Sequence, residues 1–214
     1  MAIDKEKIVE ETLKLKVVSN ALGLIPFFGV HIQRLPVDFW NGFARRIINS
    51  VPEELLPSME ELLVNAARQC GYHTAHGVIL SREWTMIVST MVRTIEDMLH
   101  AVFVTFSVWG WGNTEIKEIV PKQKMIVRAY DYYESDVVLY GRAGQPSAYM
   151  MRGMCAAFMD LAYGKPYPAG MGTFYCVQTR GIEIGDDYGE FVVSRNPTLP
   201  MKLSGTGVQS VGSL

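Results

Sequence analysis

The stretch Met125-Ile-Val-Arg-Ala-Tyr130 decides the fold class, because here the hydrophobic period changes from helical to alternating. Met125, Val127 and Ala129 share one face of an extended chain, as in a strand with one buried face. We expect residues 135–140 to form its antiparallel partner. The C-terminal half therefore contains a sheet.

The segments that follow supply a helix and two more strands. The apolar, methionine-rich run after Pro146 predicts a helix that Gly164 ends. Residues 173–179 and 188–193 are predicted strands, turned by Gly185-Asp-Asp187.

The N-terminal half is predicted to be helical. Expected helices cover residues 4–22, residues 36–50, a segment from the Ser58-x-x-Glu61 capping box to Gly71, and a long segment from Ser81 to Leu99. Residues 23–36 form an apolar loop. Helices followed by paired strands indicate an α+β fold, with helices covering one face of an antiparallel sheet.

Composition excludes several classes of protein. The chain has 214 residues, of which 49% are hydrophobic, with 20 Lys+Arg against 22 Asp+Glu. A net charge of −2 gives no electrostatic basis for binding nucleic acid. The longest apolar stretch, 99–111, is too short to span a bilayer. We expect a cytoplasmic protein without a membrane span.

Three cysteines, Cys70, Cys155 and Cys176, are widely spaced and form no C-x-x-C motif. They are expected to be free thiols. His73 and His76 stand three residues apart and could ligate a metal, but no acidic third ligand accompanies them, so a polar turn between helices is favoured. No nucleophile motif or dinucleotide fingerprint is present.

Arg152 is the single charge between Ser147 and Met159. Its aliphatic stem could pack while the guanidinium reaches water. Alternatively, the guanidinium binds the carboxylate or phenolate of a ligand, and the ligand is then an aromatic acid.

Three features of the C-terminal half resemble a known family. They are the run Gly110-Trp-Gly-Asn-Thr-Glu-Ile-Lys-Glu118, Gly153 in an apolar helix, and the run Gly181-Ile-Glu-Ile-Gly-Asp-Asp-Tyr-Gly-Glu-Phe-Val-Val193. Over residues 58–195 the chain resembles the 4-vinyl reductase, or hydrocarbon-binding, domain family. The resemblance implies a nitric-oxide-signalling and Golgi-transport ligand-binding-like fold. Relatives include the aromatic-sensing domains of phenol- and xylene-responsive activators and the transport-particle tethering subunits, and they usually dimerise.

The resemblance also implies a zinc site that this chain lacks. The positions that match the family's ligands are Ala148, Gln178, Gly181 and Gly189, and none is a normal zinc ligand. We therefore expect no metal and no cofactor.

The favoured function is a sensor or carrier that binds a small apolar, aromatic molecule. An enzyme or accessory subunit acting on an aromatic, hydrocarbon or tetrapyrrole substrate with a partner protein is one alternative, and an assembly or tethering protein is another. Arg152 or His100 is the expected polar anchor. The remaining candidate ligand contacts are apolar: Phe103, Phe106, Trp111, Val127, Ala129, Met151, Phe158, Phe174 and Cys176.

Three regions are predicted: a helical region at 1–57 that mediates homodimerisation, the binding domain at 58–195, and a flexible Gly/Ser-rich tail at 196–214. The apolar run Leu24-Ile-Pro-Phe-Phe28 supports self-association.

Overall fold

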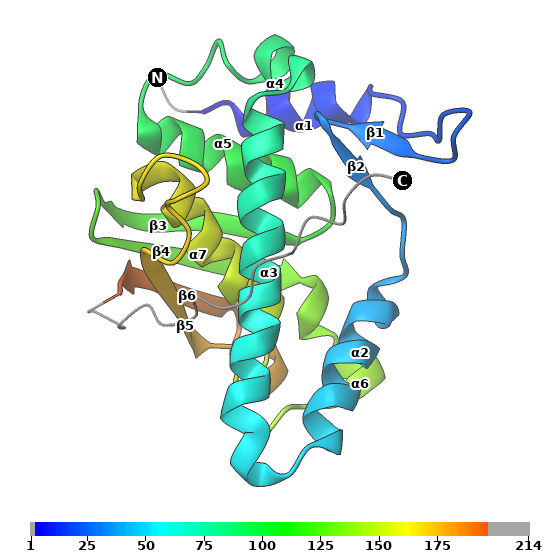
Figure 1. Cartoon of the computed structure of the whole chain (residues 1–214), viewed down its shortest axis with the longest axis vertical. Helices are drawn as coiled ribbons and strands as arrows, with labels where there is room; N and C mark the ends of the chain where they lie inside the picture. The colour runs from blue at the N-terminus through cyan, green and yellow to red at the C-terminus, as the bar shows by residue number, and fades with distance from the viewer. Residues whose placement is uncertain (1–2, 197–214) are drawn as a thin grey trace, which may run out of the picture.

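The alternating stretch at 125–130 lies in the central part of a four-stranded antiparallel sheet with strand order β3-β4-β6-β5 (Figure 1). A computed structural model describes residues 3–196 of the chain. In chain order its elements are α1 (Lys5–Leu13), β1 (Ile25–Phe27), β2 (Val30–Ile32), α2 (Val37–Ser50), η1 (Glu53–Leu55), α3 (Leu56–Ile79), α4 (Arg82–Ile87), α5 (Ile95–Val108), β3 (Gly112–Val120), β4 (Lys124–Tyr132), η2 (Tyr133–Ser135), α6 (Val137–Tyr140), α7 (Tyr149–Tyr163), β5 (Phe174–Arg180), η3 (Ile182–Ile184) and β6 (Gly189–Arg195).

The alternation in β4 sets the sheet's inner face. Met125, Val127 and Ala129 are fully buried, and Val127 lies opposite Ile116 of β3 and Phe191 of β6. The predicted α+β fold is confirmed, as are strands close to the predicted 173–179 and 188–193.

The predicted partner strand at 135–140 is wrong. This segment forms η2 and the short helix α6, because the Asp136 side chain accepts a hydrogen bond from the Leu139 amide at 2.8 Å and caps the helix. The partner of β4 is β3, in which buried and exposed residues alternate from Thr114 to Lys117 before a shift in register interrupts the alternation.

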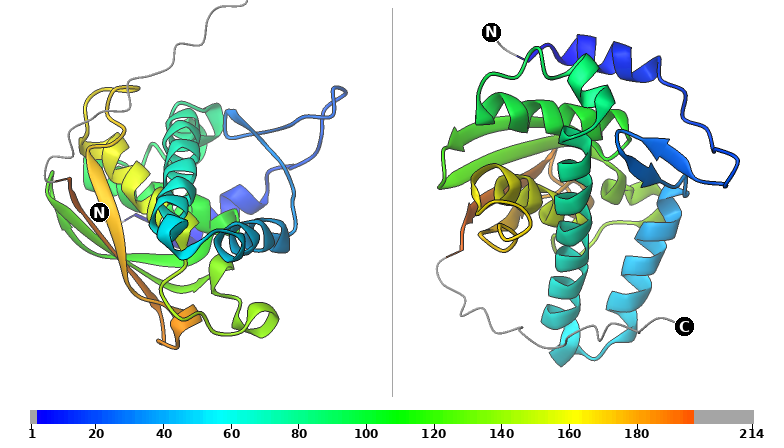
Figure 2. Two further views of the ribbon diagram at one scale, coloured as in Figure 1. Left: turned by 60° about the horizontal axis from the view of Figure 1, so that its bottom comes forward. Right: turned by 45° about the horizontal axis from the view of Figure 1, so that its top comes forward.

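Helices α5 and α7 cover the inner face of the sheet, and the long helix α3 crosses the outer side of α7 (Figures 1 and 2). Gly153 of α7 allows this crossing. A Cβ atom at Gly153 would lie 2.6 Å from Ala67 Cβ and 2.7 Å from the Arg68 amide nitrogen of α3. The two helices therefore touch backbone to backbone.

Three predicted helix boundaries are wrong. The first helix ends at Leu13 and not near residue 22. Helix α3 begins at Leu56, with Pro57 in its first turn, and continues through Gly71, where a Cβ atom would lie 2.5 Å from Met154 Sδ. Gly71 thus permits close helix packing and does not end the helix. The helix predicted from Ser81 to Leu99 is two helices, because Thr94 and Asp97 form a capping box that starts α5.

The hydrophobic core joins the N-terminal region to the rest of the described chain. Ile8 of α1 and Phe28 of the β1–β2 hairpin are fully buried in the same cluster as the inner face of the sheet. The boundary predicted at residue 57 stays a prediction. Almost all of the predicted tail, 197–214, lies outside the described residues.

Candidate functional site

A large cavity lies between the N-terminal segment and helix α3. Its volume is about 770 Å³, and apolar side chains form most of its wall. The wall comes from the end of α1, the β1–β2 hairpin, α2, α3, the end of α5 and the start of α7. Figure 2 shows the hairpin and α2 standing on the side of α3 that faces away from the sheet.

One stripe of α3 faces this cavity. Leu63, Ala66, Cys70 and Thr74 line it, and their spacing of three and four residues places them on one side of the helix. The neighbouring residue Ala67 instead packs under Gly153 of α7. The same helix therefore presents one tightly packed side and one side open to a cavity.

Aromatic rings form the inner wall of the cavity. The Trp109 ring centroid lies 5.3 Å from that of Phe27 and 5.0 Å from that of Phe106. The Trp111 ring meets Tyr133 edge to face at 5.5 Å. Such tilted and edge-to-face pairs are the arrangements that aromatic rings favour, so this wall suits a further ring.

Three residues of the wall hold polar atoms that lack a partner. Thr12 Oγ1, Trp109 Nε1 and Tyr133 Oη are buried, and none has a hydrogen-bond partner within residues 3–196. A buried unsatisfied polar group costs about 1–3 kcal/mol. These three are the only such side-chain atoms in the described part of the chain, and all three belong to residues around one cavity.

The Tyr133 hydroxyl is held in its protonated form. Burial raises its pKa well above the usual range, and the nearby Glu134 and Cys70 add to the rise. A protonated phenol and an indole N–H can each donate a hydrogen bond to an oxygen atom of a ligand.

Two of the predicted contact residues, Phe106 and Trp111, line the cavity. The structure places the other predicted residues elsewhere. Phe103 of α5 and Phe158 of α7 are buried, and their rings meet edge to face with centroids 4.9 Å apart. Five more are buried in the core between α7 and the sheet: Val127, Ala129, Met151, Phe174 and Cys176.

The two predicted polar anchors also lie away from the cavity wall. The Arg152 Nε donates a hydrogen bond to the backbone carbonyl of Cys176 at 3.4 Å, so the half-buried guanidinium has a protein partner. His100 lies on the exposed side of α5. Sequence reasoning did not single out Thr12, Trp109 and Tyr133, although Trp109 stands between Phe106 and Trp111 in the sequence.

Three of the four positions aligned with the family's zinc ligands, Ala148, Gln178 and Gly181, lie together in space. Gln178 Oε1 accepts a hydrogen bond from the Ala148 amide at 3.1 Å, and Gln178 Nε2 donates to Glu183 at 2.7 Å. Tyr132 also donates to the buried Glu183 carboxylate. This network joins α7 to the β5–β6 hairpin.

These residues do not fit a zinc ion. The network offers one carboxylate, where a structural zinc site needs four ligands, mostly cysteine or histidine. A Cβ atom at Gly181 would lie 2.6 Å from Gln178 Nε2 and 2.7 Å from the Glu183 carboxylate oxygens, so a cysteine there would require both side chains to move. Within the described ranges no group of three or more His, Cys, Asp or Glu residues could hold a metal.

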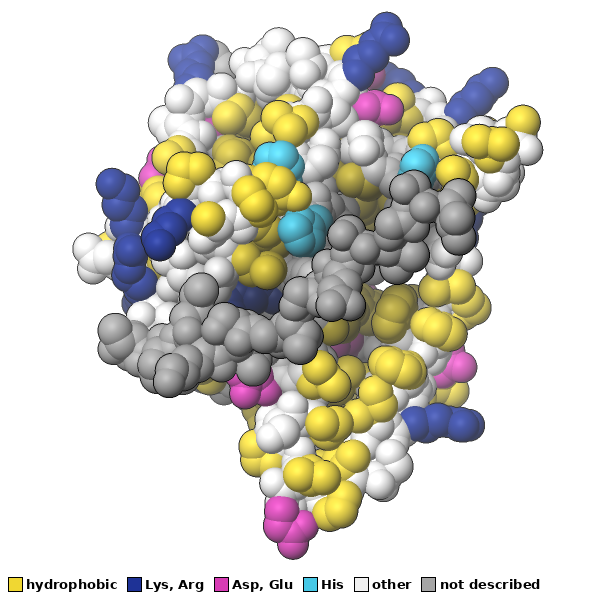
Figure 3. Space-filling model, in the orientation of Figure 1, with side chains coloured by type: hydrophobic (Ala, Val, Ile, Leu, Met, Phe, Trp, Pro, Cys, Tyr) yellow, Lys and Arg dark blue, Asp and Glu magenta, His cyan; other side chains and the backbone are white. Residues whose placement is uncertain are grey.

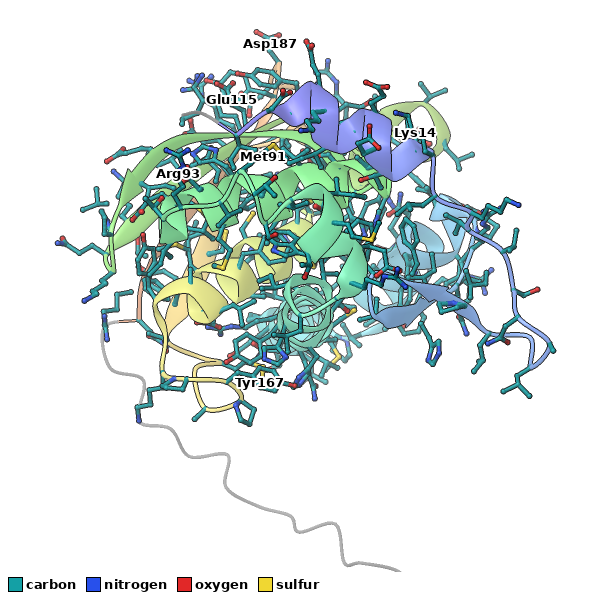
Figure 4. All side chains as sticks on the ribbon, turned by 90° about the horizontal axis from the view of Figure 1, so that it is seen from above. Lys14, Met91, Arg93, Glu115, Tyr167 and Asp187 are labelled. Carbon is teal, nitrogen blue, oxygen red and sulfur yellow. The ribbon has the colours of Figure 1, made fainter. Side chains whose placement is uncertain are left out.

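His73 and His76 lie inside α3 and not in the predicted turn. Their partner is Tyr167, which Figure 4 labels beside α3 seen end-on. His73 Nδ1 is 2.8 Å from Tyr167 Oη, and the His76 ring stacks on the Tyr167 ring with centroids 3.6 Å apart. The pair fixes the loop after α7 onto α3.

Among the described helices, none is both long enough and apolar enough to cross a membrane.

The chain shares its fold with proteins of known structure. No protein-family model matches it, and no curated protein shows a significant sequence match. The phenol-responsive sensory domain of the transcription activator PoxR, solved with phenol, superposes with a TM-score of 0.68 at 11% identity, covering 91% of this chain and 92% of that one. A trafficking protein particle complex subunit 3 from Naegleria fowleri, covalently bound to palmitic acid, gives a TM-score of 0.54 at 10% identity, covering 76% of this chain and 94% of that one.

A vinyl-4-reductase family protein from Methanocaldococcus jannaschii aligns less well, with a TM-score of 0.44 at 14% identity over 89% of this chain and 91% of that one. The first two structures, a phenol-responsive sensory domain and a trafficking-particle subunit, are of the kinds that the sequence resemblance implied as relatives. Identities this low establish the fold alone, and the predicted fold is confirmed.

Proposed function

We propose that the chain is a binding module for a small aromatic molecule that carries a hydroxyl group, held in the cavity beside α3. The observation that carries the proposal is the concentration of unsatisfied polar atoms around an apolar cavity. Ligand sites are mostly apolar, with a few polar groups that orient the ligand. A hydroxylated ring would bury its face against Phe106 and Trp109 and satisfy Tyr133 or Trp109 through its oxygen. The phenol-bound sensory domain with the same fold supports this ligand class.

The test compares phenol with toluene by isothermal titration calorimetry. In the Tyr133→Phe variant the cavity keeps its shape but loses one hydroxyl, so phenol should bind about five- to tenfold more weakly, the usual value of one hydrogen bond. Toluene affinity should not change. The control is Tyr188→Phe, a tyrosine whose ring packs against Arg128 on the outer face of the sheet. If wild-type protein binds neither compound, the proposal is wrong.

A second candidate is a carrier of a covalently attached aliphatic chain. Cys70 is an exposed free cysteine that lines the cavity, so an acyl chain on its sulfur could enter the apolar space. The palmitic acid in the trafficking-particle subunit supports this alternative. Incubation with palmitoyl-coenzyme A, followed by intact-mass measurement, should then show one added acyl group that is absent from the Cys70→Ser variant.

We also propose that the protein is a homodimer. Phe39 of α2 is 51% exposed and Val138 of α6 is 95% exposed, and the two helices are neighbours because Tyr140 Oη donates to the Asp38 carbonyl at 3.4 Å. Hydrophobic side chains gather over α2 and the nearby part of α3 in Figure 3. A two-fold contact would cover this surface.

Light scattering should give a mass near twice 24.0 kDa. A Phe39→Glu, Val138→Glu double variant should give the monomer mass. Leu80→Glu, at an exposed position at the far end of α3, should leave the dimer intact. A monomeric wild type would rule out this interface.

A further inference from the structure

A second, smaller space adjoins the cavity. Its volume is about 190 Å³, and it lies between α2, η2, the segment after α6 and the start of α7. Ala44 and Tyr149 line both spaces, so the two are direct neighbours. About half of the wall of the small pocket is polar, and its polar side chains are those of Asn41, Arg45, Asn49, Glu134, Gln145 and Ser147.

Helix α2 explains why a mainly apolar space and a half-polar one lie side by side. Val37, Trp40 and Ala44 form the stripe that faces the large cavity, and Asn41, Arg45 and Ile48 form the stripe that faces the small one. A helix turns by about 100° per residue, so these stripes are adjacent. The small side chain of Ala44 lies where they meet.

Arg45 is held in place with no acidic partner. Its Nη1 donates to the Tyr140 carbonyl at 3.1 Å, and its Cζ lies 4.5 Å from the centre of the Tyr140 ring. No carboxylate of residues 3–196 lies within 4.0 Å of its nitrogens. A half-buried guanidinium that is oriented in advance, with donors to spare, suits a carboxylate ligand.

The Glu134 side chain is mostly uncharged at neutral pH, so it neither pairs with Arg45 nor repels a ligand carboxylate. Its carboxyl oxygens accept hydrogen bonds from the Met150 and Met151 amides at 2.9 and 2.8 Å. Burial raises its pKa to about 8, with repulsion from Glu183 adding to the rise and Arg152 opposing it. The second nearby carboxylate, that of Glu60, accepts hydrogen bonds from Gln145 and Tyr149.

We propose that the small pocket is the head-group site for the ligand of the cavity, so that the ligand is an amphiphile whose carboxylate pairs with Arg45 and whose apolar body fills the space beside α3. This inference rests on the proposed function. It extends that function from a small phenol to a longer aromatic acid, and it assigns the anionic anchor to α2.

The test uses 4-pentylbenzoate and its neutral analogue 4-pentylbenzamide, titrated at pH 7 into wild type and variants. In Arg45→Met, which keeps the side-chain length, the benzoate should bind about ten- to a hundredfold more weakly, as expected when one partner of a charged pair is removed. The benzamide should change by less than about threefold. Arg45→Lys should restore part of the benzoate affinity. The matched control is Arg46→Met, an exposed arginine one position along α2 that lines neither space.

A second variant does not depend on Arg45. Ala44→Leu should narrow the boundary between the two spaces, so it should weaken the binding of 4-pentylbenzoate, which spans both, more than that of phenol, which needs the large cavity alone. If Arg45→Met weakens the binding of benzoate and benzamide equally, Arg45 has a structural role and the inference is overturned. Arg34, just after β2, also lines the large cavity, so a loss of benzoate affinity in Arg34→Met alone would place the head group there and also overturn the inference. Binding of phenol without 4-pentylbenzoate would leave the proposed function standing and refute the head-group site, whereas binding of no probe would refute both.

Discussion

The two sides of helix α3 meet opposite environments. On one side Ala67 is fully buried under Gly153 of α7, and Arg68 pairs with Asp160. On the other side Ala66, one residue earlier, borders a cavity of about 770 Å³. The packed side maintains the fold, because close packing leaves no space for another molecule. The open side is where we propose the ligand binds, because an apolar space with a few unsatisfied polar groups is typical of ligand sites.

The largest effect is expected from breaking the packed side at Asp160. Its side chain is fully buried, pairs with Arg68 at 2.7 Å, and accepts hydrogen bonds from the Gly172 and Phe174 amides. Asp160→Asn leaves the Arg68 charge unpaired, so the free energy of unfolding should fall by about 3–5 kcal/mol.

Urea denaturation measures this loss. Glu118→Gln, which removes an exposed ion pair with Lys124, is the control and should cost at most about 1 kcal/mol. Equal costs for the two variants would contradict the contrast between buried and exposed pairs.

The helix crossing itself should be the next most sensitive point. Gly153→Ala adds a methyl group against the backbone of α3, which cannot move aside cheaply, and should cost about 1–3 kcal/mol. Gly144→Ala is the matched control, because a Cβ atom there meets nothing within 4 Å. Thermal unfolding of both variants measures these costs. If Gly153→Ala does not lower the melting temperature, the two helices are not in close contact.

A pH titration tests the small pocket beside the cavity, whose wall includes Glu134. The folded-state pKa of Glu134 is raised from 4.5 to about 8, so its contribution to stability is present below pH 4.5 and is lost as the pH rises toward 8. Glu134→Gln does not titrate. The stability of wild type relative to this variant should therefore fall by up to about 1.4 kcal/mol per pH unit across that window. A difference that stays constant with pH would mean that Glu134 ionises normally.

The smallest effect is expected from removing metal. The Gln178–Glu183–Tyr132 network fills the place that the resemblance assigns to zinc, so EDTA should leave the melting temperature unchanged. Elemental analysis of dialysed protein should find well under one zinc per chain. One tightly held zinc per chain would show that the positions were aligned wrongly.

The sequence was sufficient to predict those elements whose hydrophobic periodicity lies within one segment of the chain. The alternation in β4 and the apolar run of α7 predicted both elements. Strand β3 was missed because its charged residues alternate with few apolar ones at a sheet edge. The length of α3 was missed because the role of Gly71 depends on Met154, which lies far away in the sequence.

The candidate site could be predicted only in part. Phe106 and Trp111 are aromatic residues of the longest apolar stretch, 99–111, which is visible in the sequence. Thr12, Trp109 and Tyr133 come from three separate segments, and their missing partners become visible only when the chain is folded. The same is true of Arg152, whose carbonyl partner on β5 was not apparent from the sequence.

The most direct test of the central claim is phenol binding to the Ala66→Phe variant. The larger ring should occupy the cavity beside α3 while the packed side of the helix is untouched. We predict that the free energy of unfolding changes by less than about 1 kcal/mol and that calorimetry no longer detects phenol binding. Wild-type phenol affinity in a folded Ala66→Phe protein would contradict the account, because the ligand would then bind somewhere other than this cavity.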